Sequence, residues 1–298
     1  MLNNYLINPA VAGIEHYADI KLASRVQWTQ VDGRPESLYF TAFTPFFISS
    51  KGRRNARTRN LRGDQNMPSH HRFGIKILAD RTGAYRRNYA SLSYAYHLRL
   101  DRKWNLALGL AGGRVQHRVD RTNIDIQNNF DPLLSDNNLT ESRLDLSAGL
   151  WLYSKAFYFG VSGLQLLDTE PRFLTVTEEV NQVAPGNYFL TIGYRWLLDD
   201  NTMLTPSFLL KKAAGDSWTG DAALKAIFYE RFWLGAGLRN YQSLLAYAGI
   251  SITPNLDISY AYDQGVSGIS RFGMNSHEIL IGFKLANPQK VYCPQWSW

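Results

Sequence analysis

The residues of this chain whose types could do chemistry stand far apart in the sequence. His70 and His71 are adjacent, and neighbouring side chains of a strand point to opposite faces, so this pair lacks the geometry of two metal ligands. No third ligand lies near them, and we interpret the pair as part of a solvated loop. Residues 128–138 are rich in Asn and Asp but lack the fixed spacing of a calcium-binding loop. The sequence therefore predicts no metal site.

Groups for catalysis or phosphate binding are equally scattered. Asp145, Asp257 and Asp263 lie on polar faces, which explains them without general acid or base catalysis. Residues Gly109 to Gly113 are rich in glycine but open no helix, so we interpret them as making room and not as a phosphate cradle. The single cysteine, Cys293, excludes an internal disulfide. We expect a protein without enzymatic activity and without a cofactor.

The net charge of +7 is concentrated in one segment. Six of these charges belong to a run without acidic residues, which leaves +1 for the rest of the chain. Such a run forms a solvated loop or a docking arm for a partner protein or for acidic lipid. No nucleic-acid recognition motif accompanies it, so we expect no nucleic-acid partner. We call this run the basic arm; its members are Lys51, Arg53, Arg54, Arg57, Arg59 and Arg62.

The elements that must position these residues are strands. Apolar side chains recur at every second position, as between Ala90 and Leu100, where the even positions are mostly Leu and Tyr. The odd positions there include Ser91, Ser93 and Arg99. A period of two is the pattern of a strand with two different faces. No run of about 18 uncharged apolar residues occurs, which excludes a helical membrane span.

Fourteen segments share this alternation, and their lengths approach the roughly 9–11 residues that a tilted strand needs to cross a bilayer. The sequence therefore predicts one all-β domain over residues 1–298, a closed antiparallel transmembrane β-barrel of 14 strands. Closure removes the exposed strand edges that favour aggregation. The predicted strands are 18–30, 36–46, 72–80, 85–100, 103–116, 143–154, 156–166, 187–198, 202–212, 219–230, 232–240, 243–252, 255–263 and 277–286.

The connections between the predicted strands differ between the two ends of the barrel. Short turns fall on the side of both termini, whereas most long loops, such as 117–142 and 167–186, fall on the opposite side. Bacterial outer-membrane barrels have short periplasmic turns and long extracellular loops. We therefore expect three periplasmic segments, namely 1–17 at the N-terminus, a loop at 47–71 with the basic arm, and a C-terminal tail at 287–298.

The two faces of the strands predict two environments. Leu, Ile, Phe and Tyr form the outward set, and Pro206, inside a predicted strand, indicates a bulge or the first position of a ladder. Aromatic residues at strand ends suit the two interfacial belts, and we assign to them Trp28, Tyr39, Trp104, Tyr188, Trp196, Trp218 and Trp233. The charged side chains that we expect to face the lumen are Lys21, Arg25, Lys76, Arg99, Arg195 and Lys225.

Several short motifs resemble one protein family. Residues 6–13 (Leu-Ile-Asn-Pro-Ala-Val-Ala-Gly) and 25–28 (Arg-Val-Gln-Trp) resemble the start of the PorP/SprF family of type IX secretion outer-membrane proteins. Further resemblances follow in the family's order over the whole chain, at residues 206–211, 232–239, 258–263 and 276–283 and at the closing Cys293-Pro294. No secretion signal is visible after Met1, although a barrel must cross the inner membrane, so we expect the numbering to start inside a mature chain.

The resemblance implies a barrel without catalytic residues in the outer membrane of a Gram-negative bacterium. In the SprF-like branch of the family, the barrel is paired with one large exported cell-surface protein, such as a gliding-motility adhesin. In the PorP-like branch, it is counted among the components of the secretion machinery. The sequence places this chain on neither branch.

Three hypotheses about function follow. The barrel binds the C-terminal domain of an exported surface protein, through its lumen and outer loops, and supports secretion and surface attachment. Alternatively, it docks periplasmic and translocon components of the machinery through 47–71 and 287–298, or it is a diffusion channel, whose lining would carry denser opposed charge. Outer-membrane lipid is a further expected partner. The candidate partner-binding residues are the basic arm, Asn8, Pro9, Trp296 and Trp298.

Overall fold

The computed structural model describes residues 2–44, 69–120, 138–167, 186–213, 215–266 and 275–287. Two short 3-10 turns, η1 (Asn4–Leu6) and η2 (Pro9–Val11), precede the strands. Neither of these turns is long and apolar enough to cross a membrane. The strand segments are β1 (Ala18–Gln27), β2 (Glu36–Thr44), β3 (His70–Thr82), β4 (Tyr85–Arg99), β5 (Asn105–Asp120), β6 (Asn138–Tyr153), β7 (Phe157–Leu164), β8 (Asn187–Tyr194), β9 (Trp196–Leu197), β10 (Thr202–Lys212), β11 (Thr219–Phe228), β12 (Phe232–Arg239), β13 (Ser243–Thr253), β14 (Leu256–Gly265) and β15 (Ser276–Leu285).

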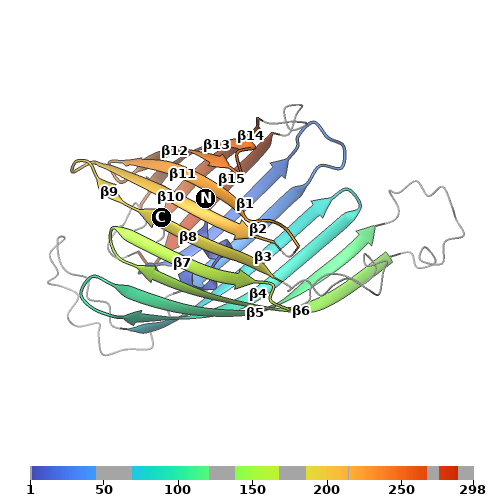
Figure 1. Ribbon diagram of the computed structural model, residues 1–298, viewed down its shortest axis with the longest axis horizontal. Coiled ribbons are helices and arrows are strands. Elements are labelled where there is room, and N and C mark those ends of the chain that lie inside the picture. Colours follow the sequence, from blue (N-terminus) through green and yellow to red (C-terminus); the bar gives the residue numbers. More distant parts are fainter. Residues whose placement is uncertain are drawn as a thin grey trace, which may run out of the picture.

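These strands form one closed barrel. Each strand pairs antiparallel with its neighbours in sequence, and β15 pairs with β1, which joins the two ends of the sheet (Figure 1). Because β8 and β9 are two parts of one strand, the barrel has 14 strands, and the predicted fold class is confirmed. The backbone donors and acceptors of a closed barrel are paired between strands, which is what allows it to sit in hydrocarbon.

Pro206 accounts for the division between β8 and β9. Both segments pair with β10, and the register is unbroken, because Ser207 faces Gly193 and Leu204 faces Trp196. Pro206 lies within β10 opposite this gap and has no N–H to donate. Our expectation of a bulge or a first ladder position was therefore wrong, since the missing donor interrupts one ladder and leaves the register intact.

The two rims of the barrel differ as predicted. Five connections on the rim of the termini are short, at residues 100–104, 154–156, 198–201, 229–231 and 254–255. The opposite rim carries most of the long connections, including 121–137 and 165–186. We call these the short-turn rim and the long-loop rim. β2 ends and β3 begins at the short-turn rim, and β3 begins at His70, earlier than expected from the predicted loop 47–71.

The early start of β3 changes the interpretation of the two adjacent histidines. His70 points inward and stacks on His97, with 4.8 Å between the ring centroids. His71 points outward, and its Nδ1 atom lies 2.6 Å from the hydroxyl of Tyr94. The two rings diverge, as expected, but both residues belong to a strand and not to a solvated loop.

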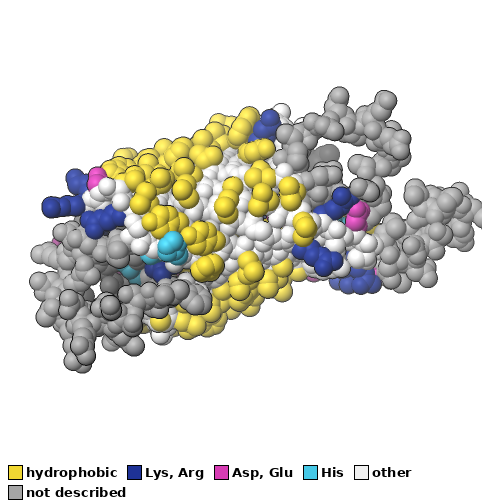
Figure 2. Space-filling view, turned by 90° about the horizontal axis from the view of Figure 1, so that it is seen from below, with side chains coloured by type: hydrophobic (Ala, Val, Ile, Leu, Met, Phe, Trp, Pro, Cys, Tyr) yellow, Lys and Arg dark blue, Asp and Glu magenta, His cyan; other side chains and the backbone are white. Residues whose placement is uncertain are grey.

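The alternation of the sequence separates lipid-facing from inward side chains. On β4, Leu92 is 67% exposed, whereas its neighbours Ser91 and Ser93 are buried. The exposed apolar side chains form a band around the middle of the barrel, with charged groups beyond it (Figure 2). Two of the expected interfacial aromatics lie inside instead, because Tyr39 and Trp233 have inward positions on their strands and are 5% and 7% exposed.

The strands differ in length around the barrel. β4, β5 and β6 have 15, 16 and 16 residues, whereas β7 and β12 have 8. Sixteen residues exceed the roughly 9–11 that a tilted strand needs to cross a bilayer. The excess lies at the long-loop rim, where the first ten residues of β6 pair with β5 and have no register with β7. This wall therefore extends past the hydrocarbon layer on that side.

Candidate functional site: a plugged lumen below a charged mouth

The N-terminal segment runs inside the barrel. Asn3 and Asn8 begin its two 3-10 turns, and each side chain accepts a hydrogen bond from the backbone N–H two residues on, the preferred chemistry of a helix cap. Pro9 follows Asn8 at the first helical position, where its missing N–H does no harm. We call residues 2–17 the plug.

The wall of the barrel holds the plug by donating to its backbone. Arg72 donates from Nε to the carbonyl of Gly13 at 3.1 Å, and Ser162 donates to the carbonyl of Ile7 at 2.5 Å. His97 Nε2 lies 2.9 Å from the carbonyl of Ala12, which only accepts, so this nitrogen carries the proton. These bonds satisfy carbonyl groups that a plug without regular structure would otherwise leave unpaired.

Asn8 makes the converse contact. It is 1% exposed, and its Nδ2 atom donates to the carbonyls of Leu150 at 3.0 Å and Val161 at 3.2 Å, one on β6 and one on β7. Its Oδ1 atom meanwhile caps η2. One amide therefore fixes the plug to two strands and shapes its local turn.

Small residues in the wall allow the plug to come close. A Cβ atom added to Gly109 would lie 2.3 Å from the backbone nitrogen of Ala10, and one added to Gly149 would lie 2.1 Å from Oδ1 of Asn8. This supports the prediction that the glycine-rich stretch makes room. Gly13 has a positive φ of 69°, and its missing Cβ leaves space for Arg72.

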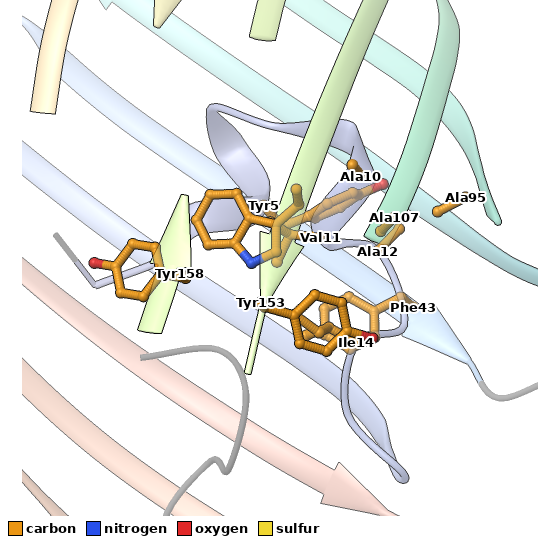
Figure 3. Close-up of a cluster of buried hydrophobic side chains, with 11 residues drawn as sticks. Tyr5, Ala10, Val11, Ala12, Ile14, Phe43, Ala95, Ala107, Tyr153 and Tyr158 are labelled. Atoms are coloured by element: carbon orange, nitrogen blue, oxygen red, sulfur yellow. The ribbon is translucent and has the colours of Figure 1, made fainter. Parts of the chain in front are cut away.

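Apolar side chains complete the attachment. Tyr5, Val11 and Ile14 of the plug are at most 2% exposed and gather with wall residues (Figure 3). The ring of Tyr5 meets that of Phe43 edge-on at 5.8 Å, and its hydroxyl lies 2.6 Å from Ser93 Oγ. The wall residues of this cluster are Phe43, Ala95, Ala107, Trp151, Tyr153 and Tyr158.

The position of the plug differs from our expectation for residues 1–17. We expected a periplasmic segment, and the structure places its described residues among the inward side chains of the barrel. Asn8 and Pro9, which we named as candidate partner-binding residues, are buried there against β6. Their contacts are with the barrel wall itself.

Above the plug, towards the long-loop rim, charged side chains follow one another along the wall. Asp221 accepts from Lys211 at 3.2 Å and pairs with Arg239, which also bonds Asp263. Asp263 and Glu278 both pair with Arg25, at 3.4 and 3.5 Å. We call this row the ion-pair chain; it crosses β10, β11, β12, β14, β15 and β1 and consists of Lys211, Asp221, Arg239, Asp263, Arg25 and Glu278.

Of this chain, our list of lumen-facing charges contained Arg25 alone. The sequence placed Asp263 on a polar face, but Asp221 and Glu278 were missed as lumen-facing charges, although both lie on the inward positions of their strands. The plug was missed because its residues show no strand or helix period. The Asn-Pro pair and Gly13, which shape its turns, were the available signal.

The other expected lumen charges occupy different levels. Lys76 is buried, with Nζ 3.4 Å from the carbonyl of Leu6 and 5.0 Å from the ring centroid of Tyr89. Lys225 lies 5.4 Å from the ring centroid of Trp233. At the short-turn end, Lys21 pairs with Asp19 at 3.0 Å, Arg99 donates to the carbonyl of Asp101 at 2.8 Å, and Arg195 stands half-buried between β8 and β9.

Among the described residues, two cavities lie beside the plug, on the side of β10 to β14. Each has a volume of about 30 Å³, enough for about two waters. Asn4, Lys225 and Tyr247 line the first, and Leu2 and Glu278 are among the residues that line the second. The plug thus packs tightly against β2 to β7 and less tightly against the opposite wall.

The remaining candidates lie outside the described residues. These are the basic arm, Trp296 and Trp298, together with Cys293 and the Asn-rich segment 128–137. Within the described ranges, no group of three His, Cys, Asp or Glu side chains gathers to hold a metal ion.

Comparison with known proteins identifies the family. The family described as "Type IX secretion system membrane protein PorP/SprF" matches residues 1–283. The chain belongs to the PorP/SprF family. This membership and the barrel fold place the protein in the outer membrane, as a barrel of the type IX secretion system. The PorP/SprF family is not a family of enzymes.

The solved structures similar to this chain are outer-membrane barrels. The Pseudomonas putida toluene transporter TodX has a TM-score of 0.53 at 8% identity, over 95% of this chain and 94% of that one. The Ralstonia pickettii toluene transporter TbuX gives 0.51 at 10%, over 95% and 92%, and Acinetobacter baumannii Omp33 gives 0.50 at 10%, over 92% and 100%. At these identities the likeness concerns the fold alone. No curated protein matches the chain.

Proposed function

We propose that this protein is a non-enzymatic holder for one exported cell-surface protein. It binds the C-terminal domain of that cargo at the long-loop rim and supports the cargo's secretion and surface attachment. The cargo is adhesin-like in the sense that it stays on the cell surface after export. Membership of the PorP/SprF family supports a role in type IX secretion, and the long-loop rim is the surface that contacts the cargo in this proposal.

The observation that carries this proposal is the plug. A segment that caps its own turns, receives bonds from Arg72, His97 and Ser162, and fits against wall glycines is a built part of the interior. A barrel whose lumen is occupied in this way offers its rim for contact, and the strands β4 to β6 project at that rim.

The test is affinity purification of the tagged full-length protein from native outer membranes in mild detergent, followed by mass spectrometry. We expect one very large exported protein to dominate the co-purified material. If periplasmic and translocon components dominate instead, the barrel is a structural part of the machinery and the holder proposal fails.

Two matched variants separate these outcomes. Asp120 pairs with Asn138 in the β5–β6 ladder, so residues 121–137 can be replaced by a short Gly-Ser turn without disturbing the strands. We expect this variant to lose the cargo. Changing the six residues of the basic arm to Gln is the control on the opposite rim, and we expect it to keep the cargo. Loss of machinery components by the arm variant alone would support the docking alternative.

A diffusion channel is the second candidate, because one observation favours it. The ion-pair chain provides more opposed charge in the lumen than we expected from the sequence. Those charges bond each other along the wall, however, and the plug occupies the lumen beside them. Single-channel recordings of the purified protein in planar bilayers test this candidate, and steady conductance of the unmodified chain would favour it over the holder.

A further inference from the structure

Four arginines lie on the outer face of the barrel near the long-loop rim. Arg81 stands opposite Arg86 across β3 and β4, and Arg86 stands opposite Arg118 across β4 and β5. Arg114 lies on the same face of β5, about 13 Å along the strand from Arg118. Like charges directly opposite each other on one face repel, so this arrangement favours a bound anion.

The charges of this patch are accessible. Arg81, Arg114 and Arg118 are exposed, and the side chain of Arg86 is 42% exposed. Two acids lie on this face: Asp120 pairs with Arg86 at 3.2 Å, and Glu36, which stands opposite Arg81 on β2, pairs with Arg34 at 3.2 Å. Neither Arg81 nor Arg114 has an ion-pair partner among the described residues.

The patch grades into the lipid-facing band. Asn88, Gln116 and Ser142 form the next outward row toward the membrane centre, with Gln116 opposite both of the others. Leu92, Leu144 and Leu146, all exposed, continue the face below them. Arg114 lies in the row below these polar residues, opposite Leu144, so the basic patch overlaps the edge of the apolar surface. Figure 2 shows basic side chains beyond the hydrophobic band at both ends of the barrel.

The rest of the barrel lacks this feature. At the long-loop end of the remaining described strands, the outward positions carry one Lys or Arg, Lys212, which lies 6.0 Å from the ring centroid of Trp218. The clustering is therefore a property of β3 to β5. A charge on the lipid face is costly near the midplane and tolerated near the interface, so Arg114, the deepest of the four, gains most from an anionic partner.

We propose that this patch binds the phosphorylated headgroup of an acylated glycolipid in the outer leaflet. Arg guanidinium groups bind phosphate through paired N–H donors. The amides of Asn88 and Gln116 bond sugar hydroxyls, and the leucines below contact acyl chains. The inference goes beyond the proposed function and rests only on the barrel's place in the outer membrane, with its long loops outside.

The test compares lipid binding by three full-length proteins purified in mild detergent and stripped of lipid. They are the wild type, the variant R81Q/R114Q/R118Q, and the control R102Q/K103Q/K155Q, which removes three exposed charges from the short-turn rim. We expect lipopolysaccharide to bind the wild type and the control alike. The arginine variant should bind roughly 100-fold more weakly, since each basic residue near an anionic lipid surface contributes about fivefold.

Further arms distinguish the sources of the phosphate and keep the test decisive. R81K/R114K/R118K should retain most of the affinity, and R114Q alone should lose about fivefold, which provides a measurement if the triple Gln variant does not fold. Dephosphorylated lipopolysaccharide, phosphatidylglycerol and inorganic phosphate should each bind or compete far more weakly. Equal binding of any of these three, or unchanged affinity of the triple Gln variant, would overturn the proposal, as would loss of an acidic protein partner with lipid binding intact.

Discussion

The wall formed by β3 to β7 and the wall formed by β10 to β14 use the same alternation to build two different interiors. On the first, inward glycines, serines and alanines fit the plug, as at Gly109 and Gly149. On the second, inward acids and bases bond each other, as at Asp221 and Asp263, and two cavities remain. The two walls also differ in strand length: β3 to β6 of the first have 13 to 16 residues, and only β7 is as short as 8, whereas β10 to β14 have 8 to 11.

The difference shows that alternation decides which side chains face inward, whereas the contents of the lumen decide what those side chains are. Where a second segment fills the space, the wall must be small and must supply donors to an irregular backbone. Where no segment fills it, charged groups on neighbouring strands satisfy one another. Energetically, the first wall therefore depends on packing and the second on electrostatics.

The largest effect is expected from enlarging a plug-facing glycine. In Gly109→Val, the new Cβ would lie 2.3 Å from the backbone nitrogen of Ala10. A backbone atom cannot move aside by rotating, as the end of a side chain can. We expect the plug to be displaced, with a loss of about 3 kcal/mol in the free energy of unfolding and with conductance appearing in planar bilayers. Gly112→Val is the control on the same strand, because a Cβ there meets nothing within 4 Å. Equal conductance of the two variants would contradict the plug's role in closing the lumen.

A somewhat smaller effect is expected at Asn8. Asn8→Ala removes a cap and two partly buried hydrogen bonds, which together stabilise the fold by roughly 2–3 kcal/mol. Asn8→Asp keeps the cap but places carboxylate oxygens against the carbonyls of Leu150 and Val161, so we expect it to be at least as destabilising. Urea unfolding in detergent micelles measures both. Asn255→Ala in an exposed turn is the control, and a loss there as large as at Asn8 would show that the bridge to β6 and β7 is unimportant.

The opposite wall should respond less to a single change and more to salt. Asp263 is shared by Arg25 and Arg239, whose side chains are about a quarter exposed, so Asp263→Asn should cost about 1–2 kcal/mol, below the range for fully buried pairs. The exposed pair of Arg34 and Glu36 is the matched control, and Glu36→Gln should cost about 0–1 kcal/mol. Urea unfolding at low and high salt checks both, and a larger effect at Glu36 would contradict this ranking.

Much of the fold could be predicted from residue types alone. The segment Ala90 to Leu100 alternates strictly, and the structure buries its odd positions as far as His97 and exposes most of its even ones, because lipid and lumen select different side chains. For Tyr39 and Trp233, the prediction from residue type was wrong. They are aromatic and near strand ends, but their positions point inward, so strand position determined their environment where residue type did not.

The site was less predictable, for a physical reason. The plug has no period, since its conformation is set by caps, one proline and contacts that span up to 155 positions in sequence, such as Ile7 with Ser162. A local pattern carries no information about such distant partners. The ion-pair chain was easier to predict from the sequence, because Asp221, Asp263 and Glu278 share an inward face with the basic residues that pair with them.

The smallest effect concerns Pro206, at the edge of the second wall. The backbone N–H of Leu198 donates to the carbonyl of Thr202, so the even-numbered residues of β10 direct their backbone groups toward β8 and β9. Pro206 is one of these residues and lies opposite Tyr194, but it has no N–H to donate. Pro206→Ala adds one ladder hydrogen bond of about 1 kcal/mol but lets the unfolded chain explore more conformations, which costs about 0.4–1 kcal/mol. We expect little net change in the free energy of unfolding, and slower hydrogen exchange at Trp196 together with a protected amide at position 206. Unchanged exchange at Trp196 would show that β8 and β9 are divided by something other than the missing N–H, and that the second wall owes its irregularity to its side chains.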